Sequence, residues 1–179
     1  ENVMKHILNT AASFVDQRFI FQNFGHSNYK SREVSVAFNN LDAAKVIQVI
    51  YPWTNVEPPI LPDYKKSPRL QFLDTGILNF DLNIQADLLL MKDLSEAYKG
   101  AIIPHIINQE VLSLNTTDYK KTNFWVRDKT QSSAEVDLLI AHGKFLIPIE
   151  IKSGKTGSLK SLHQFVNQAP HQFAVRMYG

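Results

Sequence analysis

The sequence predicts a mixed α+β / α/β protein in two parts, residues 1–80 and residues 81–179. Three observations predict this class. Apolar residues at helical spacing come first, two β-rich runs around a proline-rich loop follow, and the second half alternates helical and strand-like runs. A length of 179 residues is enough for one medium domain or two small ones.

Composition excludes several classes of protein. Apolar residues make up 44% and charged residues 20% of the chain, and no apolar run reaches the ~18 residues of a membrane span, so we expect no membrane partner. Cysteine is absent, which excludes disulfides and cysteine zinc sites and agrees with a cytoplasmic location. Because position 1 is Glu and a helical pattern starts at once, we expect a fragment of a longer polypeptide; a trimmed start is the alternative.

The first part has the outline of a winged-helix-like unit. The pattern predicts helices over residues 2–15 and 31–41, then strands over 46–51 and 70–73. Four of the eight prolines fall in residues 55–68, which are therefore a loop. Basic and aromatic residues stand near the N-terminus of the second helix, where winged helices contact nucleic acid: Tyr29, Lys30 and Arg32. A DNA-reading role and a packing role both remain open for this unit.

The second part predicts the element order α-β-β-β-α-β. A less defined helical stretch covers residues 75–94 and leads into it. The predicted elements are a helix over 102–114, strands over 123–127, 134–140 and 145–151, a helix over 158–168 and a strand over 172–178. Ser158 is the expected N-cap of the second helix. A helix between two neighbouring strands predicts a parallel, right-handed crossover.

A hairpin joins the second and third of these strands. If His142 and Gly143 are its two turn residues, Asp137 faces Pro148 and lies diagonally to Glu150, about 7–8 Å away at Cα. Because proline cannot donate to a ladder, we expect a bulge or an unpaired edge at Pro148. Alternation then gives a core face and an opposite polar face. The core face holds Val136, Leu138, Ile140, Ile147, Ile149 and Ile151; the polar face holds Glu135, Asp137, Glu150 and Lys152.

A third acid is expected to join this polar face. Glu110 lies three and four residues from Ile107 and Ile106, on the apolar stripe of the helix over 102–114. A buried carboxylate needs a partner such as a lysine or a metal ion. The alternative for all these residues is an ordinary solvated face of charged side chains.

This order of acids and lysine resembles the PD-(D/E)XK nuclease superfamily, which has a restriction-endonuclease-like α-β-β-β-α-β core. The segments 67–76, 134–137 and 148–159 are also similar to the C-terminal region of bacterial and archaeal AAA-superfamily ATPases, a region of unassigned function. The resemblance covers residues from about Tyr29 onward. It implies a winged-helix-like part and a nuclease-like part that follow an ATPase domain, with ATP bound only in that missing domain.

The resemblance implies a catalytic set of Glu110, Asp137, Glu150 and Lys152. Asp137 and Glu150, with Glu110, would bind Mg²⁺ or Mn²⁺ for hydrolysis of DNA phosphodiesters, and Lys152 would orient the attacking water. The superfamily has a proline before the second-strand acid, whereas this chain has Val136. A non-catalytic module with a degenerate nuclease fold, used for protein interaction or assembly, is therefore the alternative, and an oligomer is open.

Two other signals carry less information. Gly154-Lys155-Thr156 matches the end of a phosphate-binding loop, but Ile149 stands where the first glycine is needed, which excludes nucleotide binding there. Residues 120–160 contain eight Lys or Arg against four acids, an excess of four that favours a polyanionic partner such as DNA.

Overall fold

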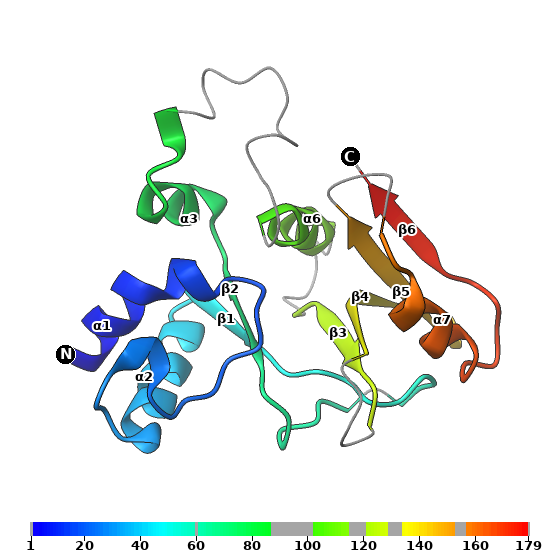
Figure 1. Ribbon diagram of the computed structural model, residues 1–179, viewed down its shortest axis with the longest axis horizontal. Coiled ribbons are helices and arrows are strands. Elements are labelled where there is room, and N and C mark those ends of the chain that lie inside the picture. Colours follow the sequence, from blue (N-terminus) through cyan, green and yellow to red (C-terminus); the bar gives the residue numbers. More distant parts are fainter. Residues whose placement is uncertain are drawn as a thin grey trace. The chain divides into compact units, whose positions relative to one another are not determined.

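The computed structural model describes residues 2–59, 61–86, 102–114, 121–128, 134–152 and 157–178 (Figure 1). The chain divides into two compact units that are not contiguous in sequence. The first contains Glu1–Ile50 and Ser67–Glu110, and the second contains Tyr51–Lys66 and Val111–Gly179. The domain boundary predicted between residues 80 and 81 stays a prediction.

The first unit consists of helices with one β-hairpin, as predicted. Its elements are α1 (Asn2–Ala11), α2 (Ser31–Ala43), β1 (Ile47–Ile50), β2 (Arg69–Phe72) and α3 (Thr75–Asp81), with short 3-10 turns at Ala12–Phe14 and Phe24–His26; α6 (Ile102–Ser113) begins in this unit. The two strands are antiparallel, with Ile47 opposite Phe72. The predicted helix over 75–94 extends beyond the described residues after position 86.

Aromatic side chains form the core of the first unit beneath its helices. Phe19 stacks on Phe38 with ring centroids 4.7 Å apart, and Phe24 meets Phe38 edge-on at 4.8 Å. All three are buried, so this cluster explains why helical residues 31–43 pack against the loop that precedes them.

The second unit has the predicted strand and helix order. Its elements are β3 (Asn123–Val126), β4 (Glu135–His142), β5 (Phe145–Lys152), α7 (Lys160–Val166) and β6 (Val175–Tyr178). The sheet order is β3-β4-β5-β6 (Figure 1). The first two pairings are antiparallel and β5 pairs parallel with β6 across α7. The mixed α and β class and the order around this sheet are therefore confirmed.

A segment from the first half of the sequence extends this sheet. Trp53 forms a parallel bridge with Trp125 of β3, and its backbone N–H donates to the Phe124 carbonyl oxygen at 2.8 Å. The indole N–H of Trp125 donates to the Thr54 carbonyl oxygen at 3.1 Å. Residues 51–66 thus belong to the second unit and cover the edge of β3.

The hairpin register differs from the prediction. Gly143 and Lys144 are the turn residues, His142 pairs with Phe145, and Leu139 pairs with Pro148. Gly143 has φ +58°, a conformation that glycine adopts without strain and that suits a two-residue hairpin. In this register Asp137 stands opposite Glu150, one step beyond the pair of Leu138 with Ile149.

Pro148 does not distort the pairing of β4 with β5. The pair that closes a two-residue turn is hydrogen-bonded, and pairs alternate from there, so Leu139 and Pro148 form a non-hydrogen-bonded pair. Of the two outcomes expected at Pro148, the bulge is therefore wrong. The unpaired edge is found instead, because Pro148 precedes Ile149, the first residue that pairs with β6.

The core of the second unit lies between the sheet and α7. One cluster of buried residues there consists of Trp53, Trp125, Ala134, Val136, Leu139, Leu146, Leu162 and Phe165. Burial of the predicted core face is confirmed for Val136, Leu138, Ile149 and Ile151, whereas Ile140 and Ile147 are half-buried. Because Leu138, Ile149 and Ile151 are also buried, both faces of these strands are covered and alternation could not identify the α7 side.

No helix among the described residues is both long and apolar enough to cross a bilayer.

Candidate functional site

Asp137 lies at an irregularity of β4. Asn123 pairs with Leu139 but Trp125 pairs with Val136, so two residues of β4, Asp137 and Leu138, oppose one residue of β3. This is a β-bulge, a device that redirects a side chain and is frequent beside active sites. The Asp137 carboxylate accepts the backbone N–H of Ile151 at 2.9 Å. The bulge therefore aims Asp137 at β5 instead of leaving it on a regular face.

Glu150 and Lys152 lie on β5 two residues apart and share one face of the strand. Glu150 is buried, with 6% of its side chain exposed, whereas 30% of the Lys152 side chain is exposed. The Lys152 Nζ lies 2.5 Å from a Glu150 carboxylate oxygen. The charge of a buried carboxylate is thus balanced by an ammonium group that still reaches solvent.

Gly157 helps to position Lys152. Its φ is +146°, which side chains rarely adopt, and a Cβ added there would lie 3.4 Å from the Lys152 Cδ. Gly157 therefore lies close to the lysine stem, which restricts where the ammonium group can go.

Two residues of β6 belong to the same face, and sequence analysis missed them. Glu150 pairs with Arg176 and Lys152 pairs with Tyr178. Paired residues of neighbouring strands point to the same side of a sheet. Arg176 and Tyr178 are identified by the parallel register of β6 against β5, which could not be predicted from the sequence. We call Asp137, Glu150, Lys152, Arg176 and Tyr178 the β-face site.

Glu110 does not fit its predicted position. It is exposed on α6, whereas His105 and Asn108 are the buried residues of that helix. The prediction that Glu110 lies on an inward stripe is therefore wrong, and it belongs to the first unit. Its role as a metal ligand stays a prediction. Within the described ranges, no group of three or more His, Asp or Glu side chains is placed to hold a metal ion.

The remaining donor set suits a hard cation with open positions. Asp137 and Glu150 offer carboxylate oxygens from neighbouring strands. Mg²⁺ is commonly held by one or two carboxylates, with waters and substrate phosphates completing its shell. Two acids therefore fit Mg²⁺ or Mn²⁺, with the substrate as a further ligand.

A different polar cluster lies inside the first unit. The Arg69 guanidinium contacts the Asp16 carboxylate at 3.2 Å, and the Gln71 amide donates to the same carboxylate at 3.2 Å. The Asn108 amide donates to the Gln71 side-chain oxygen. These side chains are buried, so the cluster joins the loop after α1, β2 and α6 through hydrogen bonds shielded from water.

His105 adds a buried imidazole to that unit. It is 0% exposed, and neither ring nitrogen makes a hydrogen bond to a described residue. Burial lowers the pKa of His105 from 6.5 to about 4, because the charged imidazolium would lose its hydration. His105 is therefore neutral at pH 7.

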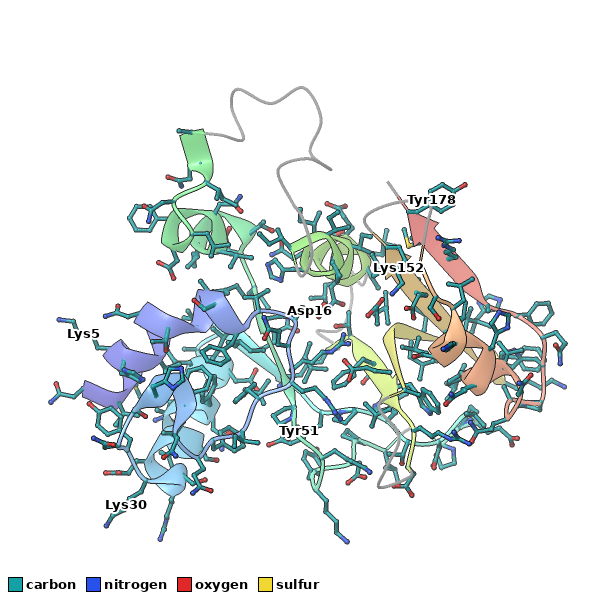
Figure 2. The ribbon with its side chains drawn as sticks, in the orientation of Figure 1. Lys5, Asp16, Lys30, Tyr51, Lys152 and Tyr178 are labelled. Carbon is teal, nitrogen blue, oxygen red and sulfur yellow. The ribbon has the colours of Figure 1, made fainter. Side chains whose placement is uncertain are left out.

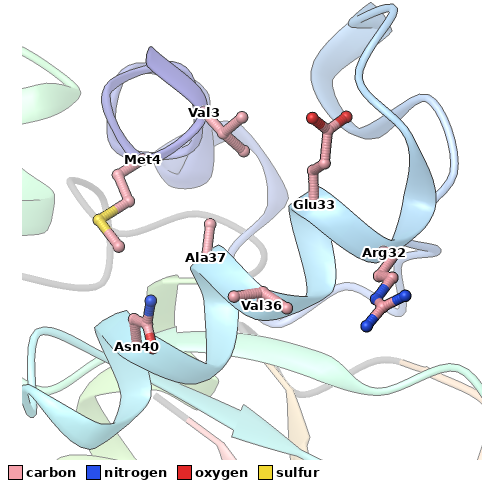
Figure 3. Close-up of a pocket in the computed structure, with 7 residues that line it drawn as sticks. All are labelled: Val3, Met4, Arg32, Glu33, Val36, Ala37 and Asn40. Atoms are coloured by element: carbon pink, nitrogen blue, oxygen red, sulfur yellow. The ribbon is translucent and has the colours of Figure 1, made fainter. Parts of the chain in front are cut away.

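An open pocket lies between α1 and α2 (Figure 3). Val3, Met4 and Val36 form its apolar part, and Arg32 and Glu33 stand at one end. Glu33 accepts the Lys30 backbone N–H at 2.9 Å and caps α2. The charges of Arg32 and Glu33 cancel, so this end of α2 is not a strongly basic surface.

Comparison with known families divides the chain in two. Residues 1–88 are similar to a domain of unknown function (DUF8612), and residues 99–178 are similar to a second domain of unknown function (DUF4143). No curated protein and no solved structure gives a significant match. The β-face site lies within the second matched region.

Proposed function

We propose that the second unit is a nuclease-like domain that binds a divalent cation and acts on the phosphodiester backbone of DNA. The observation that supports it is that the Asp137 carboxylate, at the bulge of β4, accepts the backbone N–H of Ile151, the residue between Glu150 and Lys152 on β5. This set of two acids and one lysine resembles the PD-(D/E)XK pattern on a matching α-β-β-β-α-β order. We also propose that this chain is the C-terminal region of an AAA-superfamily ATPase. The ATPase domain would then be its partner and would bind the ATP.

Each residue of the set has a chemical role in this proposal. Asp137 and Glu150 would hold the cation, which supplies Lewis-acid chemistry and a more acidic water when bound. Lys152 reaches solvent and carries a positive charge, so it would orient the attacking water or stabilise charge that develops on the phosphate. The close approach of Gly157 would keep the ammonium group near that position.

Cleavage tests the catalytic part of the proposal. Supercoiled and branched DNA are incubated with the purified chain and Mg²⁺ or Mn²⁺. Lys152→Ala is expected to lower the cleavage rate at least about 100-fold, because a positioned charge at the reacting phosphate is lost. Lys160→Ala, an exposed lysine at the start of α7, serves as the matched control and should cleave normally. No cleavage by wild type, or equal cleavage by Lys152→Ala, contradicts catalysis.

Metal binding tests the site separately from turnover. Calorimetric titration with Mn²⁺ should show binding to the wild-type chain that Asp137→Asn weakens at least tenfold, because one anionic oxygen ligand is lost. Equal affinity of the two proteins would remove Asp137 from the site.

A non-catalytic interaction module is the second candidate. The apolar side chains of Val175 and Met177 are 40% and 38% exposed on the edge strand β6, which is typical of a protein contact. Absence of Mn²⁺ binding, together with self-association abolished by Met177→Lys in sedimentation measurements, would favour this function.

A further inference from the structure

Beyond its acids and lysine, the β-face site carries an exposed aromatic ring beside a guanidinium group. Tyr178 is 57% exposed, and the Arg176 Cζ lies 5.5 Å from the centroid of its ring. Figure 2 shows Lys152 and Tyr178, both labelled, at the same end of the neighbouring strands β5 and β6. One ring and two cations therefore stand on one face, next to the two carboxylates.

We infer that Arg176 and Tyr178 form a subsite for an unpaired nucleotide, with the Tyr178 ring stacking on the base and the Arg176 guanidinium contacting a phosphate. The inference rests on the proposed function, because it takes the neighbouring acids and Lys152 as the place where the backbone is acted on. It names the substrate class of that site as single-stranded nucleic acid or single-stranded ends.

The chemistry of the subsite favours a nucleotide over other anions. A guanidinium group offers paired donors to phosphate oxygens, and an exposed ring offers a flat apolar surface to a base. An acidic peptide would use the cations but has no group that needs the ring. The stacked contact of Arg176 with Tyr178 also holds the ring in place before a base arrives, which lowers the ordering cost of binding.

The geometry requires an unpaired base. In a duplex the faces of the bases are covered by their neighbours, so a protein ring can stack only on a base at an end or in a single strand. Tyr178 lies on the outermost strand of the sheet and its ring is more than half exposed, so a single strand can reach it.

Fluorescence anisotropy tests the inference. Labelled oligo-dT and oligo-rU of twelve nucleotides and a DNA duplex of the same length are titrated with the protein in EDTA, so that no cleavage occurs. Tyr178→Leu is expected to weaken binding of the single strands about tenfold, because the stacked base loses its aromatic partner. Tyr178→Phe should restore most of the affinity, and Arg176→Gln should weaken binding and reduce its salt dependence.

The matched control is Phe173→Leu, an exposed aromatic residue that precedes β6 and lies outside the β-face site, and it should bind like wild type. Tighter binding of oligo-dT than of oligo-rU would identify DNA as the source of the nucleotide, and the reverse would identify RNA. The inference is overturned by absent single-strand binding, by equal affinity of Tyr178→Leu, or by equal binding of duplex and single strands. The binding titrations contain no metal and are independent of the cleavage assay. If Tyr178→Leu binds single strands like wild type and still cleaves DNA with Mg²⁺, the subsite is wrong and the proposed function stands.

Discussion

Each unit contains one acid whose side chain is 6% exposed and paired with a cation, but the two cations differ. In the first unit Arg69 is 5% exposed, so the Asp16–Arg69 pair is closed to water. In the second unit Lys152 is 30% exposed, so the Glu150–Lys152 pair is open on one side. A closed pair can only hold the fold together, whereas an open pair can exchange its partner for a ligand. Exposure of the cation therefore separates the pair that only stabilises the fold from the pair that we propose to be functional.

The largest expected effect comes from neutralising the acid of the closed pair, Asp16–Arg69. Asp16→Asn leaves the Arg69 guanidinium buried without its counter-charge, and we expect it to lower the free energy of unfolding of the first unit by about 3–5 kcal/mol. Asp16 has φ +57°, which asparagine also tolerates, so the backbone is not disturbed. Glu150→Gln is the matched change, and because Lys152 can turn to solvent it should cost only about 1 kcal/mol or less.

Urea unfolding can follow the two units separately. Both tryptophans, Trp53 and Trp125, belong to the second unit, so their fluorescence reports that unit, while circular dichroism reports both. Equal losses for Asp16→Asn and Glu150→Gln would contradict the distinction between closed and open pairs.

The next effect concerns acid sensitivity, which should come from the first unit. The pKa of His105 is lowered to about 4, so the unfolded chain binds a proton at higher pH than the folded chain does. The contribution of neutral His105 to the free energy of unfolding is complete above pH 6.5. It falls by about 3 kcal/mol as the pH decreases from 6.5 to about 4. His105→Leu should flatten this part of the stability profile measured by urea unfolding between pH 4 and 7. An unchanged slope would show that His105 is not the group responsible.

The smallest expected effect compares a glycine from each unit. Gly25 and Gly143 have nearly the same φ, +60° and +58°. A Cβ at Gly25 would lie 2.8 Å from the His6 Nε2 and 2.9 Å from the Thr10 Oγ, whereas a Cβ at Gly143 meets nothing within 4 Å. Gly143→Ala should therefore cost only the backbone strain, about 1 kcal/mol, and Gly25→Ala about 2–3 kcal/mol because the clash is added. Thermal unfolding measures both, and equal losses would mean that the residues around Gly25 relax freely.

The order of helices and strands could be predicted from the sequence because each element carries its own periodicity. The helix predicted over 158–168 appears as α7, Lys160–Val166. Its N-cap is Leu159 and not the predicted Ser158, although the Ser158 hydroxyl accepts the Lys160 backbone N–H at 3.3 Å. The pairing register could not be predicted in the same way. Both His142-Gly143 and Gly143-Lys144 satisfy a two-residue turn, and β5 is buried on both faces, so its pattern does not distinguish them.

The site was predicted in part for similar reasons. Glu150 and Lys152 lie on one short strand, so their common face follows from alternation alone. Glu110 was misplaced because it lies on the isoleucine stripe of α6, whereas the buried side chains, His105 and Asn108, lie on the opposite side of the helix, so apolar spacing did not mark the inward side. Arg176 and Tyr178 depend on the parallel register of β6, which is set by tertiary packing and has no local signal.

The Trp53 bridge has a consequence for anyone who wishes to study the second unit by itself. The polypeptide passes between the two units three times, at residues 50–51, 66–67 and 110–111. A protein shortened to begin after residue 80 would lack Trp53, which caps β3 and packs in the same core as Trp125 and Phe165. In that shortened protein, β3 would expose unpaired backbone amide groups and the Trp125 indole, and we expect it to aggregate during purification. To produce the second unit separately, residues 51–66 must therefore be included, either fused to its N-terminus or added as a peptide.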